Sequence, residues 1–214
     1  MFISYNEACA RDCSTLEQDL VLCEKAGFDY IEIRLDMLTD YLKRHTVEEL
    51  AAFFCTSRLK PHAFNALYLY PEFLSEGDDE ARQKELLEEF RLGCEVGRAI
   101  GSHYFIIVPP LQRDPAGGPY TGSWEDTFSN CVRILKELSR RAEPYDMNLC
   151  FELVGFERSS VRSIGQADAV VRAVDRPNVG FVFDSYNIFL NGGCNDFSAI
   201  GSVQPEKIFA VHLM

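Results

Sequence analysis

Short apolar runs recur along the chain, and longer stretches with apolar residues three or four positions apart lie between them. A short run of apolar or alternating residues is typical of a strand, whereas the wider spacing is typical of a helix with one buried face. The predicted strands cover residues 2–6, 28–34, 61–67, 103–108, 148–152, 178–184 and 208–212. The pattern therefore predicts seven strands with helical connections.

The helical stretches carry start and stop signals. A helix over residues 15–26 precedes Gly27, a common helix end, and Thr46 and Glu49 have the spacing of a capping box. Further helical segments are predicted for residues 37–57, 79–100, 124–144 and near 197–201, with long loops at 70–78 and 111–123 that could cover a site. The alternation of strand and helix predicts parallel strands with helices outside.

Polar residues recur where the predicted strands end. They are Asn6, Arg34, Asn65, Glu152, Asp184 and His212. A barrel directs all its strand ends to one centre, which favours a (β/α)8 TIM barrel over an open doubly wound sheet. We expect a single domain over residues 1–214. It would be C-terminally incomplete, because no sequence remains for an eighth strand and the last helices.

Composition narrows the class of protein. The chain has 214 residues, 47% of them hydrophobic, and a net charge of -12, which disfavours nucleic acid or an anionic membrane surface as a partner. No apolar run approaches the roughly 20 residues of a membrane span. The eight cysteines are scattered without a C-x-x-C pair, as expected of free thiols in a reducing compartment. These features predict a cytoplasmic protein that acts on a small molecule.

Glu152, Asp184 and His212 are the strongest candidates for chemistry. They stand 32 and 28 positions apart, which is about the length of one βαβ unit. They should therefore meet at the mouth of the barrel, as a set of ligands for a divalent cation such as manganese, zinc or cobalt. Taken singly, each has a plainer interpretation, as a helix N-cap, a turn residue or a core histidine.

With these residues placed, the chain resembles the xylose-isomerase-like TIM barrels, and most closely the inosose isomerases of inositol catabolism. The resemblance runs from Phe2 to His212. Its most telling segments are NEA at 6–8, LCEKAGFDYIEIR at 22–34, NAL at 65–67, AEPY at 142–145, FELVG at 151–155 and NVGFVFDS at 178–185.

The resemblance implies that Glu152, Asp184 and His212 bind the divalent metal. A second Glu from the eighth strand completes the family's site, and this chain has no counterpart of it. The family usually has Asp-x-x-His after the second ligand, whereas here Asn187 takes the place of that His. Asn187 cannot act as a protonated imidazole would.

The resemblance also implies a metal-dependent isomerase that moves a carbonyl on inosose or a ketose through an enediolate, with Glu152 moving the proton. Candidates for holding the sugar substrate are Arg34, Asn65, Asn187 and Asn6. Arg34 could equally pair with Glu32. The open edges of the first and seventh strands need cover, and a homo-oligomer is one arrangement that would supply it.

Other functions stay open at this stage. A ketose epimerase, a hydroxypyruvate isomerase and an inosose dehydratase share the expected fold, and a truncated, non-catalytic form could bind metal or sugar only. A nuclease related to the endonuclease IV branch is disfavoured by the acidic balance and by the four scattered histidines, His45, His62, His103 and His212.

Overall fold

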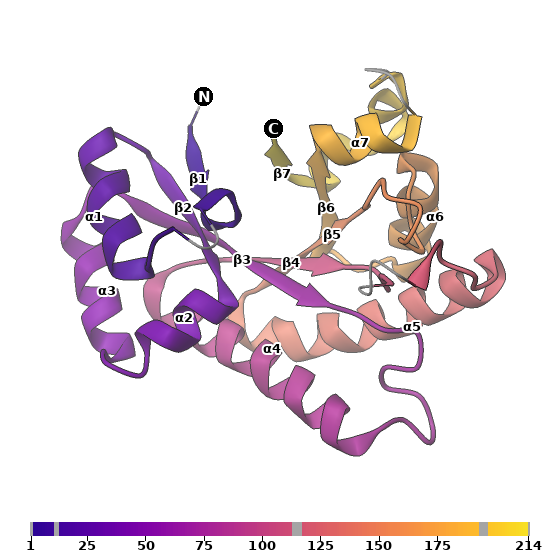
Figure 1. The fold of residues 1–214 in the computed structure, drawn as a ribbon, viewed down its shortest axis with the longest axis horizontal. Coiled ribbons are helices and arrows are strands. Elements are labelled where there is room, and N and C mark those ends of the chain that lie inside the picture. Colours follow the sequence, from indigo (N-terminus) through magenta and orange to yellow (C-terminus); the bar gives the residue numbers. More distant parts are fainter. Residues whose placement is uncertain (1, 11–12, 113–116, 193–196, 214) are drawn as a thin grey trace.

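Seven parallel strands form one curved sheet in the computed structural model, which describes residues 2–10, 13–112, 117–192 and 197–213. The sheet order follows the chain order, and the sheet curls into an open TIM barrel (Figure 1). The strands are β1 (Ser4–Asn6), β2 (Tyr30–Arg34), β3 (Lys60–Tyr68), β4 (Tyr104–Val108), β5 (Asn148–Glu152), β6 (Val179–Asp184) and β7 (Ile208–His212). Each predicted strand is confirmed, with ends within two residues.

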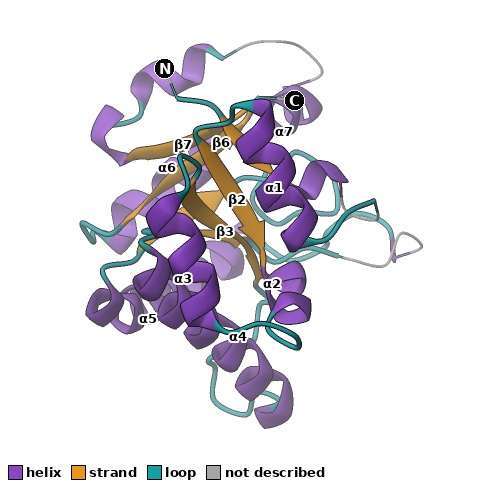
Figure 2. Cartoon of the chain, turned by 90° about the vertical axis from the view of Figure 1, so that its left-hand side faces the viewer, coloured by secondary structure: helices purple, strands orange, loops and turns teal. Residues whose placement is uncertain are grey.

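Helices connect the strands and lie outside the sheet (Figure 2). The α-helices are α1 (Leu16–Ala26), α2 (Leu35–Tyr41), α3 (Val47–Thr56), α4 (Glu80–Ile100), α5 (Trp124–Ala142), α6 (Ile164–Val174) and α7 (Ser185–Gly192). Short 3-10 turns are η1 (Glu7–Ala10), η3 (Glu143–Tyr145), η4 (Ser198–Ser202) and η5 (Pro205–Lys207).

Local sequence explains most helix boundaries. The Thr46 side chain accepts a hydrogen bond from the Glu49 backbone, and Glu49 returns one to the Thr46 backbone, so the predicted capping box is present. Gly27 ends α1 in the left-handed conformation with φ 90°, which glycine adopts without steric cost. The expected continuous stretch 37–57 is instead two helices, because α3 starts anew at its own cap.

The C-terminal third combines a helix, a 3-10 turn and residues outside the described part of the chain. Helix α7 begins directly after β6, at Ser185. The short helix expected near residue 197 is a 3-10 turn, Ser198–Ser202. Gly193, and residues 113–116 of the second predicted loop, lie outside the described residues.

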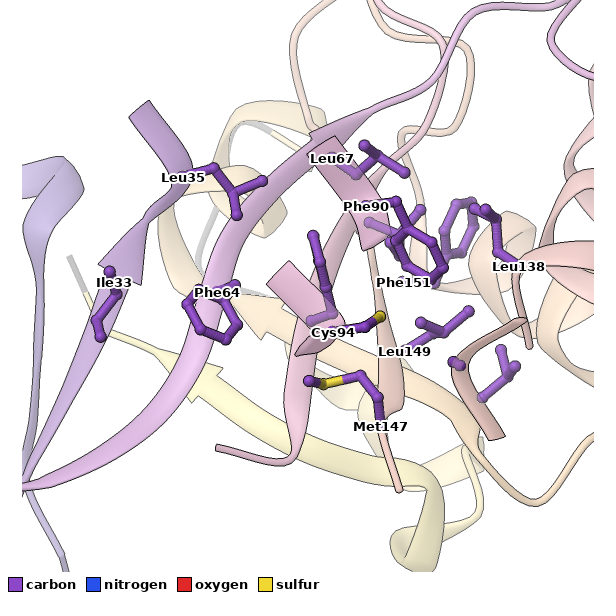
Figure 3. Close-up of a cluster of buried hydrophobic side chains, with 14 of the residues drawn as sticks. Ile33, Leu35, Phe64, Leu67, Phe90, Cys94, Leu138, Met147, Leu149 and Phe151 are labelled. Carbon is purple, nitrogen blue, oxygen red and sulfur yellow. The ribbon is translucent and has the colours of Figure 1, made fainter. Parts of the chain in front are cut away.

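The two faces of the sheet bury different side chains. The outer face packs large residues against the helices, and Figure 3 shows part of this layer, with Phe64 and Phe151 from strands and Phe90 and Leu138 from helices. The inner face holds a smaller apolar cluster: Ala63, Ala66, Ile106, Val108, Cys150, Val154 and Val182. The apolar side chains of the inner face are therefore fewer and mostly smaller than those of the outer face.

Register shifts adjust which residues face inward. The pairing of β3 with β4 has a register shift between Phe64 and Leu67. Asn65 and Ala66 lie within this shift, and both side chains face the barrel interior. A second shift lies in β7, where Ala210 packs inside but Ile208 packs against the outer core. Ile208 therefore does not share a face with His212.

β1 and β7 are the two edges of the sheet. A cavity of about 1260 Å³ runs beside them, from His103 and Lys60 at one end of the barrel to Asn6, Glu32 and His212 at the other. Within the described residues, no helix is both long and apolar enough to cross a membrane.

Candidate metal and substrate site

Glu152, Asp184 and His212 meet at the carboxyl ends of three neighbouring strands. Each offers one ligand atom, and these atoms all lie within 4.8 Å of one another. The Nδ1 atom of His212 is 3.9 Å from Glu152 Oε1 and 3.9 Å from Asp184 Oδ2. In-register pairing of β6 with β7 places Asp184 beside His212. The predicted convergence of the three side chains is thus confirmed.

Burial and mutual charge shift the acidity of this cluster. Burial raises the pKa of Glu152 to about 7, with the carboxylates of Asp184 and Glu32 adding to the rise and His212 opposing it. Burial by itself lowers the pKa of His212, but its hydrogen bond to Glu32 and the surrounding carboxylates raise that pKa to about 9. The cluster therefore concentrates negative charge around one imidazole.

Glu32 belongs to this cluster although the sequence analysis did not select it. Its Oε2 atom lies 3.0 Å from His212 Nε2, and its Oε1 atom accepts a hydrogen bond of 2.8 Å from Asn65 Nδ2. The Glu32 side chain is 2% exposed. A signal was available, because a Glu flanked by Ile31 and Ile33 in a predicted strand must point to the opposite face from those two buried residues.

Asn187 links two of the candidate ligands. Its Nδ2 donates to Glu152 Oε1 over 3.2 Å, and its backbone N–H donates to Asp184 Oδ1 over 2.9 Å. Its own Oδ1 accepts from the Gly155 backbone over 3.2 Å. Asp184 Oδ1 thus caps the first turn of α7, as the alternative interpretation of this residue predicted. Its other oxygen, Oδ2, faces His212.

Arg34 and Asn6 are engaged elsewhere at the mouth of the barrel. The Arg34 guanidinium pairs with Asp36, not with Glu32 as the alternative interpretation suggested. Asn6 Oδ1 accepts from the Ala8 backbone over 2.9 Å and so caps the η1 turn. Asn6 nevertheless lines the cavity that reaches Glu32, whereas Arg34 does not contact the three candidate ligands by any hydrogen bond in the described chain.

A second buried carboxylate lies near β1 and stands apart from the cluster. Glu7 is 0% exposed, and its Oε2 accepts from the Arg34 backbone over 2.8 Å. Burial raises the pKa of Glu7 to about 8, and the nearby Asp19 adds to the rise. Asp19 is itself buried and accepts from Ser14.

The donor set suits a divalent cation. Two carboxylates and an imidazole are ligands that manganese, zinc and cobalt accept. A metal-binding His commonly gives its other ring N–H to a carboxylate, and Glu32 takes that place beside His212. Two of the other histidines lie elsewhere: His45 pairs with Glu17 and Glu49, and His103 with Asp146. The ring of His62 packs against Tyr30 and Tyr104 and lines the cavity that reaches His212. This leaves the described chain without the His-rich set that a trinuclear nuclease site needs.

Comparison with known proteins agrees with this geometry. The family model described as "Xylose isomerase-like TIM barrel" matches residues 20–214. The chain belongs to this family. The candidate ligands lie on the barrel strands that the family match covers, and the fold expected from the sequence is confirmed.

Curated relatives align with the whole chain. The "Inosose isomerase" of Bacillus velezensis is 37% identical over 214 residues, covering 100% of this chain and 72% of that relative. The "Inosose isomerase" of Bacillus subtilis strain 168 is 35% identical over the same length, again with 72% of the relative covered.

Solved structures extend the comparison. A crystal structure described as the "IOLI protein with a binding zinc atom" is 36% identical, with a TM-score of 0.86 and coverage of 100% of this chain and 72% of that one. A D-psicose 3-epimerase structure has a TM-score of 0.74 at 16% identity, which shows a shared fold alone.

Proposed function

We propose that the chain is a metal-dependent sugar isomerase that moves a carbonyl on inosose or a closely related cyclic polyol ketone. The observation that carries the proposal is the convergence of Glu152, Asp184 and His212 within 4.8 Å. Inosose isomerases aligned over the full chain support the substrate class. The cavity that reaches His212 and Glu32 offers space for a small sugar.

Glu152, Asp184 and His212 would hold the cation, with Asp184 Oδ2 and His212 Nδ1 already turned toward each other at 3.9 Å. A divalent cation bound there would act as a Lewis acid on the substrate's carbonyl and adjacent oxygen. The zinc in the related structure supports a divalent metal; manganese and cobalt fit the same donors.

Glu152 is the residue that we assign to proton transfer. It ends β5 at the inner face, and Asn187 fixes its Oε1 through a hydrogen bond of 3.2 Å. A carboxylate held at one oxygen can use the other to take a proton from the carbon next to a carbonyl and return it to the neighbouring carbon. The residues assigned to substrate binding are Arg34, Asn65, Asn187 and Asn6; of these, Asn6 pairs with Glu32 across β1 and β2, and Asn65 is hydrogen-bonded to Glu32.

Calorimetric titration of manganese into the metal-stripped chain tests the metal site. We expect binding in the micromolar range that is lost in Asp184→Ala and retained in Glu95→Ala, which removes an exposed carboxylate of α4 paired with Arg91. Absence of binding in the parent chain, or equal binding in Asp184→Ala, would contradict the proposed site.

Exchange of substrate protons in deuterated water tests the reaction. With 2-keto-myo-inositol we expect exchange that Glu152→Gln abolishes, because the amide cannot accept the proton. Unchanged exchange in that variant would remove Glu152 from the mechanism. A panel of ketoses separates inosose isomerisation from ketose epimerisation and hydroxypyruvate isomerisation.

One alternative retains support from the structure. Asn187 stands where the resemblance leads one to expect a His, and it is already committed to Glu152, Asp184 and Gly155. A form that binds metal and sugar without catalysis would show saturable binding of both and no proton exchange.

The single-domain organisation expected from the sequence stays a prediction.

A further inference from the structure

Glu32 and His212 connect distant parts of the barrel. The two residues are 180 positions apart, and their strands β2 and β7 are not neighbours in the sheet. The 3.0 Å contact between Glu32 Oε2 and His212 Nε2 therefore crosses the barrel interior. Both side chains are nearly shielded from solvent, at 2% and 12% exposed.

The contact determines which nitrogen of His212 is available. A carboxylate can only accept, so Nε2 must carry a proton to make this hydrogen bond. Nδ1 is then the nitrogen whose lone pair can bind a cation, and it is the one that faces Glu152 and Asp184 at 3.9 Å. Asn65 holds the other oxygen of Glu32 at 2.8 Å, so the acceptor is itself fixed in orientation.

We propose that Glu32 is a positioning residue that fixes the ring orientation and the tautomer of His212, so that Nδ1 is the metal-binding nitrogen. This inference rests on the proposed function, since it assigns Glu32 a part in building the same metal site. The rival role is a structural bond between β2 and β7 that has no influence on metal binding.

Zinc affinity separates the two roles. Glu32→Met keeps a side chain of similar length without an acceptor, and Glu32→Gln keeps an acceptor without the charge. We expect Glu32→Met to weaken zinc binding by about 10–100-fold, as loss of such an outer partner does elsewhere, with Glu32→Gln between it and the parent. Glu7→Gln is the matched control, because Glu7 is an equally buried Glu that does not contact the cluster.

Nitrogen-15 NMR of the histidine rings gives a readout that a purely structural role would not move. His212 is assigned by the signals that disappear in His212→Asn. In the zinc-loaded parent we expect Nε2 protonated and Nδ1 without a proton. In the metal-free parent we expect a slowly exchanging Nε2–H that Glu32→Met loses and Glu7→Gln retains.

The outcomes separate a failure of the role proposed for Glu32 from a failure of the proposed metal site. Equal zinc affinity in the parent and Glu32→Met, or a zinc-loaded parent with the proton on Nδ1, would overturn the role of Glu32. If the parent binds no zinc, the proposed metal site fails; the Nε2–H signal in metal-free Glu32→Met then decides whether Glu32 orients the ring. If Glu32→Met does not fold, Glu32→Gln takes its place, and a zinc affinity equal to that of the parent in this variant would overturn the role of Glu32.

Discussion

The two faces of β5 and β6 carry different kinds of side chain, although the residues compared are adjacent in the sequence. Phe151 and Phe183 pack outward against helices, while their neighbours Glu152 and Asp184 point inward to the candidate site. Large apolar side chains on the outer face bury enough surface to dominate stability. The inner face can hold ionisable groups because they pair with one another there. Stability and chemistry are thus separated by the alternation of the strand.

A second contrast lies between two buried glutamates. Burial acts to raise the pKa of both Glu7 and Glu32, yet only that of Glu7 is raised, to about 8. The pKa of Glu32 is lowered because hydrogen bonds from His212 and Asn65 favour its charged form. For these two glutamates, the hydrogen-bond partners set the direction of the pKa shift.

The strongest test of the separation between faces is Phe151→Ala. Phe151 is 0% exposed, so its truncation should lower the free energy of unfolding by about 3–5 kcal/mol. Zinc affinity of the folded fraction should stay close to that of the parent, because the side chain points away from the site. Denaturant unfolding and calorimetry measure the two quantities. A loss of affinity comparable to that of Asp184→Ala would show that the faces are not separable.

The contrast between the glutamates predicts a pH dependence. The folded state holds the Glu7 proton more tightly than the unfolded chain, so the contribution of Glu7 to stability is complete below about 4.5 and declines as pH rises toward about 8. The decline is at most roughly 1.4 kcal/mol per pH unit. Urea unfolding between pH 5 and 9 should show a shallower decline for Glu7→Gln. Identical slopes would mean that Glu7 is ionised in the fold.

Gly155→Ala should disturb the inner face by steric means. A Cβ at this position would lie 1.9 Å from the backbone oxygen of Asn187, which forces the start of α7 to move. We expect a cost of about 1–3 kcal/mol and weaker zinc binding, because Asn187 supports Glu152 and Asp184. The matched variant Gly165→Ala meets nothing within 4 Å and should leave both quantities unchanged or slightly improved. Equal behaviour of the two would contradict this account.

The smallest effect compares adjacent isoleucines on opposite faces of β4. Ile106 packs inside and Ile107 outside, and both are 0% exposed. Removing one methyl group as Ile106→Val or Ile107→Val should cost about 0.5–1.5 kcal/mol in either case. Chemical denaturation of both variants measures this. A negligible cost for Ile106→Val alone would show that the interior packs more loosely than the outer layer.

Local patterning was enough to predict the strands, the parallel arrangement and the three converging residues. Glu152, Asp184 and His212 end consecutive strands, and parallel pairing brings the carboxyl ends of these neighbouring strands together in that order. The capping box at Thr46 was equally visible, because both of its partners lie within four residues. Signals of this kind need no knowledge of distant contacts.

Long-range contacts were beyond the reach of the sequence. The partner of Glu32 is His212, 180 residues away, and no local sequence pattern around either residue predicts the pair. The shift in β7 that turns Ile208 outward arises from pairing with β6. Each of these features depends on where elements lie after folding.

The bond between Glu32 and His212 also bears on the order of folding. Closing so long a loop costs chain entropy. The contact therefore adds little net stability until the intervening strands have paired. β2 can pair with β1 and β3 early, whereas His212 reaches Glu32 only when β7 has joined β6. Metal capture should therefore be a late event, and its kinetics during refolding would report the arrival of the seventh strand.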